Sequence, residues 1–277
     1  MKVKKEEKEK DFDKLISIIL PTYNSEKTID KAIQSIFEQN VKNNLEIIII
    51  DDHSTDKTID AIKNYKNTNK VKLELTKNKI NMGTGFSRKL GLSKAKGYFI
   101  AFLDSDDYWL KDKLKKQLSF FKKNYDVDFV YSDFLKELKK NGKTYHFHLR
   151  MPNYVSAKTN RYKNHIPNSS VLIKSEGIKN ISYPTIRTRN DFLYWNRILL
   201  KNKNIKAFNS NPGTPLFVYS QHPGISKRKF NLIKDQWILY RNYLNYSLLE
   251  CTYGIIVNLI YTIIKKFKIT SFLLFKK

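Results

Sequence analysis

The most restrictive feature of this sequence is an apolar run that ends abruptly in acidic residues. The run is Tyr98–Leu103, and Asp104, Asp106 and Asp107 follow within four positions. A continuous apolar run of this length predicts a strand that is covered on both faces, as in a parallel sheet. The acids would then lie just beyond the carboxyl end of the strand, where open α/β sheets bind ligands. Because adjacent carboxylates repel one another, the cluster favours a bound cation; a solvated turn that caps the next helix is the alternative.

Two similar apolar runs precede this stretch, at Leu15–Leu20 and Leu45–Ile50. Each is followed by polar turn residues and then by a helical pattern; Ser25 is placed to cap the first helix, and Ser54 or Thr55 the second. A further strand is predicted at 71–75 and a further helix at 83–95. Strand and helix thus alternate four times in about 110 residues. This alternation predicts an α/β fold with right-handed crossovers and a Rossmann-like, mostly parallel central sheet flanked by helices.

The second half of the chain has a less regular pattern. We expect helices at 111–123 and 190–200, strands at 127–132 and 169–173, and a substrate-side loop or hairpin in the polar, basic segment 136–165. No clear linker separates independent domains. The predicted organisation is a charged leader at 1–14, one folded domain at 15–228 with halves at 15–110 and 111–228, and a helical carboxyl-terminal extension at 229–277.

The carboxyl-terminal extension has one apolar helical face. Its apolar stretch is too short to span a bilayer and is interrupted by Asn258. Two interpretations are open: an amphipathic helix beside lysines suits an anionic membrane surface, or the same face packs on the protein's own core or on a partner. The residues of this face are Ile256, Leu259, Ile260, Ile263, Ile264 and Phe267.

The composition limits the partners and the compartment. The formal net charge of +26 is compatible with nucleic acid, anionic lipid head groups or phosphorylated substrates. No zinc-finger or RNP-like pattern accompanies the charge, so nucleic acid is not an expected partner. Cys251 is the single cysteine, which excludes an internal disulfide. The charged amino terminus lacks the apolar core of a signal peptide, and we expect the protein to stay in the cytoplasm.

Three motifs occur in a fixed order: SIILPTYNS at 17–25, DDHSTD at 51–56 and FLDSDD at 102–107. With these motifs the chain resembles family 2 glycosyltransferases, which have the GT-A fold, and among them bacterial enzymes of capsule, teichuronic acid or lipopolysaccharide synthesis. The resemblance is strongest from about residue 15 to 110. It implies metal-dependent, inverting transfer of a sugar from a nucleotide-sugar donor, with UDP expected, to a saccharide or lipid-linked acceptor. The place of action would be the inner face of the cytoplasmic membrane.

Several residues have the chemistry that a nucleotide-sugar donor needs. Pro21 and Tyr23 can form the apolar wall of a base pocket, and Asp52 could accept a hydrogen bond from a base N–H, as the resemblance implies for uracil. Gly83, with Gly85, permits a close approach of the backbone to the ligand. Arg88 offers a guanidinium to phosphate or ribose-side groups, although related enzymes more often have Ala-Arg-Asn where this chain has Ser-Arg-Lys at 87–89.

The resemblance also assigns roles to the acid cluster. Asp104 would contact the ribose and Asp106 a divalent metal, with Ser105 between them completing a DXD motif on the donor side. Hard oxygen ligands favour Mn²⁺ or Mg²⁺, which would stabilise the charge on the leaving diphosphate. Asp107 is expected to support the cluster or to cap a helix. Structural caps are also the preferred interpretation of Asp51 and Asp56.

A general base must remove the proton of the acceptor hydroxyl. Related enzymes have an acidic pair, commonly Glu-Asp, before an aromatic helix, and here Asn190 and Asp191 occupy that place. Asp191 is therefore the predicted base, and the alternative is that it only begins a helix. A single base opposite the leaving group implies a single displacement with inversion. In the late segment YSQHPGIS at 219–226, His222 is a candidate ligand for metal or phosphate, and a surface position is its alternative.

Two other functions compete with this one. A nucleotidyltransferase also holds a metal and a nucleotide at strand ends, but it would be expected to carry a Gly-rich, basic loop where this chain has PTYNS at 21–25. A non-catalytic basic protein that binds nucleic acid or membrane is the rival from outside the enzymes. A Rossmann dehydrogenase is disfavoured, since no G-x-G-x-x-G motif follows the first strand.

Overall fold

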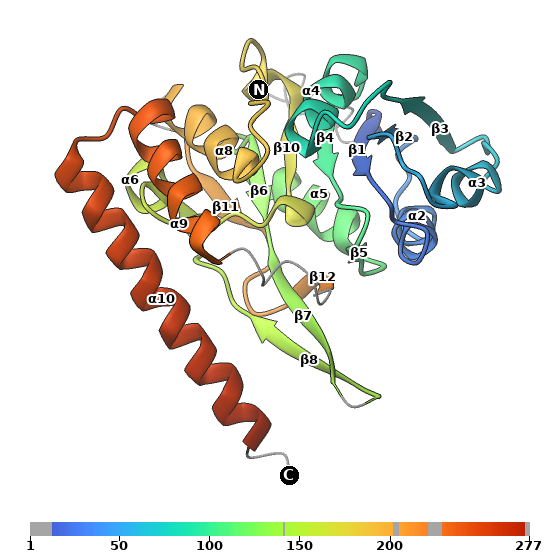
Figure 1. Ribbon diagram of the computed structural model, residues 1–277. Coiled ribbons are helices and arrows are strands. Elements are labelled where there is room, and N and C mark those ends of the chain that lie inside the picture. Colours follow the sequence, from blue (N-terminus) through green and yellow to red (C-terminus); the bar gives the residue numbers. More distant parts are fainter. Residues whose placement is uncertain (1–12, 141, 202–204, 221–228, 275–277) are drawn as a thin grey trace.

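The computed structural model describes residues 13–140, 142–201, 205–220 and 229–274. Figure 1 shows a twisted central sheet with helices on both faces, a smaller sheet beside it, and a long helix, α10, that runs down one side of the molecule. The eight strands of the central sheet lie in the order β3-β2-β1-β4-β10-β6-β11-β9. Four of the seven pairings between neighbouring strands of this sheet are parallel, which confirms the predicted mostly parallel α/β sheet.

The first half of the chain forms the regular part of this sheet. Strands β1, β2, β3 and β4 are parallel to one another, and each connection between them contains a helix. The chain moves from β1 outward to β3 and then returns to pair β4 with the other side of β1, which makes a topological switch point between β1 and β4. The elements are β1 (Ile16–Thr22), α2 (Ile29–Phe37), β2 (Leu45–Asp51), α3 (Thr58–Lys63), β3 (Val71–Lys77), α4 (Thr84–Lys94) and β4 (Phe99–Phe102).

The apolar runs form these strands because both faces of the sheet are covered. Every residue of β1 and of β4 is buried. One face packs against α2, α3 and α5 (Lys113–Lys123), and the other against α4 and α8 (Asn190–Lys201). Continuous rather than alternating hydrophobicity is the pattern expected of such doubly covered strands.

The second half of the chain completes both sheets. The predicted hairpin is present as β7 and β8, and the predicted strand at 169–173 begins later than expected. Residues 168–170 form a 3₁₀ turn, and only the following strand β10 enters the sheet, antiparallel to β4. The smaller sheet has the order β5-β12-β7-β8. The elements are β5 (Tyr108–Trp109), β6 (Phe129–Tyr131), β7 (Asp133–Lys140), β8 (Lys143–Leu149), β9 (Tyr154–Val155), α6 (Ala157–Asn160), β10 (Leu172–Lys174), α7 (Ser175–Ile178), β11 (Ala207–Asn209) and β12 (Pro215–Ser220).

The carboxyl-terminal extension is helical, as predicted, with α9 (Lys229–Ile238), a π-helical turn at 239–243 and α10 (Leu248–Leu274). Asn258 anchors α10, since its side-chain amide donates hydrogen bonds to Tyr162 O (2.6 Å) and Tyr240 Oη (3.0 Å). The predicted apolar face does not pack on the protein's own core over the described side chains. Those of Ile256, Leu259, Ile260 and Ile263 are 44–55% exposed. None of the helices in the described parts of the chain is both long enough and apolar enough to cross a bilayer.

Ser25 does not cap α2 as expected. The helix begins at Ile29, and the Ser25 hydroxyl instead contacts Tyr23 O (3.1 Å) and Ser105 Oγ (2.8 Å). Residues 25–28 form an extra turn, in which Ser25 O accepts from Thr28 N and Ile29 N. Thus the loop after β1 is tied to the acid loop after β4.

Candidate active site

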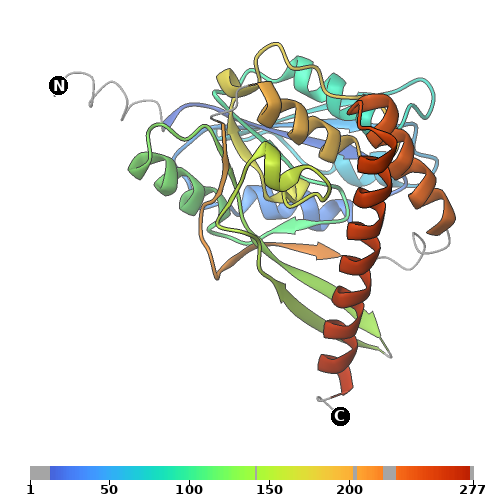
Figure 2. The same cartoon turned by 90° about the vertical axis from the view of Figure 1, so that its left-hand side faces the viewer.

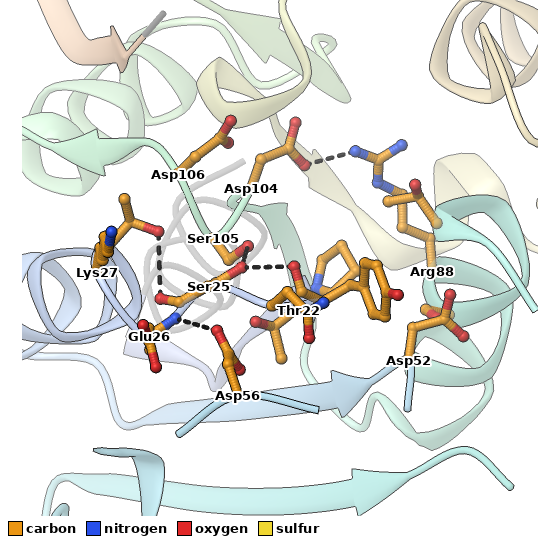
Figure 3. A pocket seen from close by; sticks show the side chains of 16 residues that line it. Thr22, Ser25, Glu26, Lys27, Asp52, Asp56, Arg88, Asp104, Ser105 and Asp106 are labelled. Atoms are coloured by element: carbon orange, nitrogen blue, oxygen red, sulfur yellow. Dashed lines mark hydrogen bonds and ion pairs between the residues drawn. The ribbon is translucent and has the colours of Figure 1, made fainter. Parts of the chain in front are cut away.

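The largest group of predicted site residues lies around one cavity of about 680 Å³ at the carboxyl ends of β1, β2 and β4. This position coincides with the switch point of the sheet, where open α/β folds bind ligands. Figure 3 shows that the walls come from the loop after β1, the acid loop after β4 and the start of α4. Of the predicted donor residues, the lining includes Pro21, Tyr23, Asp52, Arg88, Asp104, Ser105 and Asp106.

Asp52 organises the loop that leads into α4. Its Oδ1 accepts hydrogen bonds from Asn78 Nδ2 (2.8 Å) and Met82 N (2.9 Å), and its Oδ2 accepts one from Gly83 N (2.7 Å). Gly83 has a φ of 89°, a backbone conformation that side chains with a Cβ rarely adopt. The Oδ2 atom keeps one lone pair for a further donor such as a base N–H.

Gly85 has a different role from the one predicted. A Cβ at this position would lie 2.5 Å from Pro184 O and 2.7 Å from Ile186 O. The missing side chain therefore lets α4 pack against the backbone at 184–186, which leads into α8, and it does not open the helix to a ligand. Gly83 is likewise next to another part of the protein, because a Cβ there would lie 3.2 Å from Arg187 Cγ.

Three consecutive residues of the loop after β4, Asp104, Ser105 and Asp106, alternate in direction. Ser105 points toward Ser25, whereas the carboxylates of Asp104 and Asp106 project from the other side of the loop (Figure 3). No cluster of three or more His, Cys, Asp or Glu side chains suited to a metal occurs in the described part of the chain. Two carboxylates fit a hard cation such as Mg²⁺ or Mn²⁺ that takes its remaining ligands from substrate phosphates and water. His222, the other predicted ligand, lies outside the described residues.

Arg88 is buried and connects the acid loop to α8. It donates one hydrogen bond to Asp104 Oδ1 and another to Asn190 Oδ1. Burial alone would lower the pKa of Arg88, but the nearby Asp104, Tyr183 and Asp191 raise it above its ordinary value, so the guanidinium stays charged. The sequence suggested a guanidinium directed at the ligand, whereas both Nη atoms here already bond to the chain.

A second cavity of about 640 Å³ contains Asp191. It shares Asp104 with the first cavity, so the two cavities adjoin at this residue. Its walls come from one face of the smaller sheet, from the segments at 150–152 and 163–169, and from Tyr261 of α10. The predicted base therefore lies beside the predicted donor site, in a space large enough for a second substrate.

Asp191 lies in the first turn of α8, a position that also agrees with the alternative prediction that it only begins a helix. Its Oδ2 accepts a hydrogen bond from Asn164 Nδ2 (2.8 Å). Burial raises the pKa of Asp191 above that of an ordinary carboxyl, and Arg88 opposes this shift only partly. A carboxylate of raised pKa at the wall of a cavity is suited to proton transfer, because it holds a proton more firmly than an exposed acid does.

The sequence predicted a strand at 169–173 but not that Asn168 and Ser169 hold the acid loop in place. Asn168 Nδ2 donates to Asp104 Oδ1 (2.9 Å), and Ser169 Oγ accepts from Asp104 N (3.1 Å) and donates to Asp107 Oδ2 (2.5 Å). Asp107 is buried and also accepts from Ser220 N (3.2 Å), so it supports the loop and does not cap a helix. The consecutive polar residues 168–170, at the start of an otherwise apolar stretch, were the available signal.

Asp51 and Asp56, the other acids predicted to have structural roles, form local hydrogen bonds in their loop. Asp51 Oδ2 accepts from Ser54 N (3.0 Å), and Asp56 Oδ1 accepts from Thr58 N (3.0 Å) at the start of α3. The predicted caps Ser54 and Thr55 instead bond to Asn24, Ser54 by accepting from its backbone N–H and Thr55 by donating to its side chain.

An open α/β sheet with an acid loop at its switch point is the architecture of GT-A glycosyltransferases, and solved structures confirm this class. The UDP complex of Staphylococcus aureus TarS 1–349 superposes with a TM-score of 0.63 at 24% identity, covering 86% of this chain and 68% of that one. The mannosyltransferase PcManGT from Pyrobaculum calidifontis, in complex with GDP-Man and Mn²⁺, gives a TM-score of 0.60 at 17% identity, with 88% and 72% covered.

The family follows from the sequence comparisons. The model of glycosyl transferase family 2 matches residues 17–179. The chain is also 37% identical, over 81% of its length and 85% of the relative's, to UDP-Glc:alpha-D-GlcNAc-diphosphoundecaprenol beta-1,3-glucosyltransferase WfaP from Escherichia coli. This chain belongs to glycosyl transferase family 2 and is a glycosyltransferase. The interpretations as a nucleotidyltransferase or as a non-catalytic basic protein are therefore wrong.

Proposed function

We propose that this glycosyltransferase moves a sugar from a UDP-linked donor to a lipid-linked saccharide by a metal-assisted, inverting mechanism. The observation that carries the proposal is the pair of adjoining cavities that share Asp104. The names of relatives support the substrates, since WfaP is named for UDP-Glc and for a diphosphoundecaprenol-linked sugar. In this proposal residues 15–228 form the transferase domain.

The donor would bind in the cavity at the switch point. Pro21 and Tyr23 would contact the base, Asp52 Oδ2 would accept from a base N–H, and Asp104 would contact the ribose. Asp106 would hold a divalent cation, which when bound stabilises the negative charge of the leaving diphosphate. The Mn²⁺ in the structurally similar PcManGT complex supports a metal of this type.

The acceptor would bind in the second cavity with its hydroxyl against Asp191. Asp191 takes the proton of the hydroxyl, the hydroxyl oxygen bonds to the anomeric carbon, and the bond from that carbon to the diphosphate oxygen breaks. The nucleoside diphosphate leaves with the electron pair. Since the attack comes from the side opposite the leaving group, a single step inverts the anomeric centre.

A panel of nucleotide sugars tests the donor assignment. We expect a UDP-sugar with Mn²⁺ to raise the melting temperature, and a chelator to remove most of this stabilisation, because ligands that bind only the folded state stabilise it. Formation of a glycosylated lipid-linked product from the best donor would then identify the reaction. A panel in which no nucleotide sugar stabilises the protein would contradict the proposal.

We also propose that α10 holds the enzyme at an anionic membrane. The exposed apolar residues of this helix lie on the side opposite its Asn258 contact, and the chain carries a large positive charge. Flotation with anionic vesicles should show loss of binding for Ile256→Glu combined with Ile260→Glu. Leu200→Glu on α8, where the leucine is 57% exposed, is the matched control and should still float.

A further inference from the structure

The second cavity has a basic wall that the transfer chemistry alone does not explain. Lys136, Arg150 and Lys163 line it, from β7 and from the segments after β8 and α6. The acids of the cavity lie in the loop after β4 and on α8, where each is already hydrogen-bonded: Asp104 to Arg88, Asp107 to Ser169 and Asp191 to Asn164. The cavity thus contains both an acidic and a basic set of side chains.

The strand register places Lys136 on this wall. Phe134 and Lys136 are two positions apart in β7, so their side chains lie on the same face of the smaller sheet. Their partners in β12, Phe217 and Tyr219, lie on that face too. The neighbouring acid, Glu137, lies on the opposite face, where it accepts from Tyr108 Oη (3.2 Å). Within the described residues neither Lys136 nor Arg150 forms an ion pair.

These cations are suited to an anionic group of the acceptor. Lys136 is half-buried among aromatic side chains, and a buried charge is costly unless an opposite charge or hydrogen bonds compensate it. His165 does not add to the positive charge at neutral pH, because burial and the charge of Lys163 lower its pKa to about 4. Two ammonium groups and one guanidinium group around one cavity match the charge of a diphosphate.

The neighbouring helix indicates what the diphosphate is attached to. Tyr261 of α10 lines the same cavity, and Lys163 Nζ lies over its ring. The exposed residues Ile256, Ile260 and Ile263 lie on the same helix within one or two turns of Tyr261. In both views α10 and the β7–β8 hairpin extend toward the same end of the molecule (Figures 1 and 2). An apolar chain that leaves the cavity past Tyr261 would therefore run along α10, whose exposed apolar residues lie farther around the helix.

We infer that Lys136, Arg150 and Lys163 form a binding subsite for the diphosphate of a lipid-diphosphate-linked acceptor, with the lipid directed toward α10. The inference rests on the proposed function, since it assumes that the second cavity takes the acceptor. It adds the position of the phosphates relative to Asp191: the accepting sugar lies between the carboxylate and the basic wall.

Calorimetric titration with farnesyl diphosphate tests this subsite while saturating UDP and Mn²⁺ occupy the donor cavity. We expect Lys136→Gln and Arg150→Gln each to weaken binding of farnesyl diphosphate about tenfold, as for loss of one hydrogen bond to a charged group. Lys143→Gln, an exposed lysine of the same hairpin that lines neither cavity, should bind like the wild type. The affinity for UDP should be the same in all four proteins.

Three outcomes for the variants and for pyrophosphate would overturn the inference, and a fourth concerns the wild-type protein. The first is equal affinity for farnesyl diphosphate in wild type, Lys136→Gln and Arg150→Gln. The second is an equal loss of affinity in Lys143→Gln, which would indicate a general effect of charge. The third is binding of inorganic pyrophosphate as tight as that of farnesyl diphosphate. Wild-type protein that binds UDP-sugars but no farnesyl diphosphate would contradict this inference alone. Wild-type protein that binds farnesyl diphosphate but no nucleotide sugar would contradict the proposed function instead.

Discussion

The two cavities are built in different ways. The first lies at the ends of three parallel strands that follow one another within about 90 residues, β1, β2 and β4. The second is made from a hairpin, two irregular segments and helices, and its lining extends from Asp104 to Tyr261. A cavity at strand ends can be located from local sequence patterns, whereas one formed by distant loops depends on tertiary pairing. If the first binds the donor and the second the acceptor, substitutions in each should affect different measurements.

The largest effect is expected in the second cavity. Asp191→Asn should lower kcat about a thousandfold, because an amide cannot accept the proton of the acceptor hydroxyl. The affinity for the UDP-sugar should stay within about twofold, measured by calorimetry with Mn²⁺. Asp60→Asn, an exposed acid in the first turn of α3, is the control for the loss of one carboxylate. Near-normal turnover of Asp191→Asn would show that another group is the base.

In the first cavity we expect a substitution to weaken binding of the donor. Asp106→Asn should weaken Mn²⁺-dependent binding of UDP about a hundredfold, since it removes the carboxylate proposed to hold the cation. The thermal shift given by UDP with Mn²⁺ should then resemble the shift seen with chelator. Unchanged metal dependence would place the cation elsewhere.

The pH profile sharpens the assignment of the base. Burial raises the pKa of Asp191, and the unprotonated form is needed for activity. The rate should therefore fall by up to about tenfold per pH unit below that pKa, and the fall should begin at a higher pH than for an ordinary carboxyl. The measurement is kcat/KM for the acceptor at saturating donor. A profile that stays flat down to pH 4 would argue against Asp191.

The smallest effect tests the packing that joins the two cavities. Gly85→Ala would bring a Cβ against Pro184 O and Ile186 O, and we expect it to destabilise the fold by about 1–3 kcal/mol. Gly177→Ala is the matched control, because its Cβ would meet Asp128 Cβ at 3.4 Å, an ordinary contact. Urea denaturation of both variants should separate them, and equal midpoints would mean that the loop at 184–186 moves aside.

The sequence predicts the first half of the fold well because local patterns of apolar and polar residues determine it. Doubly covered strands require continuous apolar runs, and the polar residues after them must meet at one edge of the sheet. Asp52, Asp104 and Asp106 were found in this way. The parallel pairing of β12 with β7, by contrast, joins residues about 80 positions apart, and β5 has only two residues. No sequence periodicity predicts such contacts. The polar, basic segment 136–165 was therefore assigned to the substrate side without individual residues, and the role of Ser169 was not predicted.

Asp104 belongs to the walls of both cavities and is held by Arg88 and Asn168. If the donor and the acceptor bind as proposed, a substitution there would disturb both substrates at once. An engineer who wishes to change the nucleotide alone would begin with the loop at 21–28. Residues 150–152 and 163–167 are the corresponding starting point for a new acceptor.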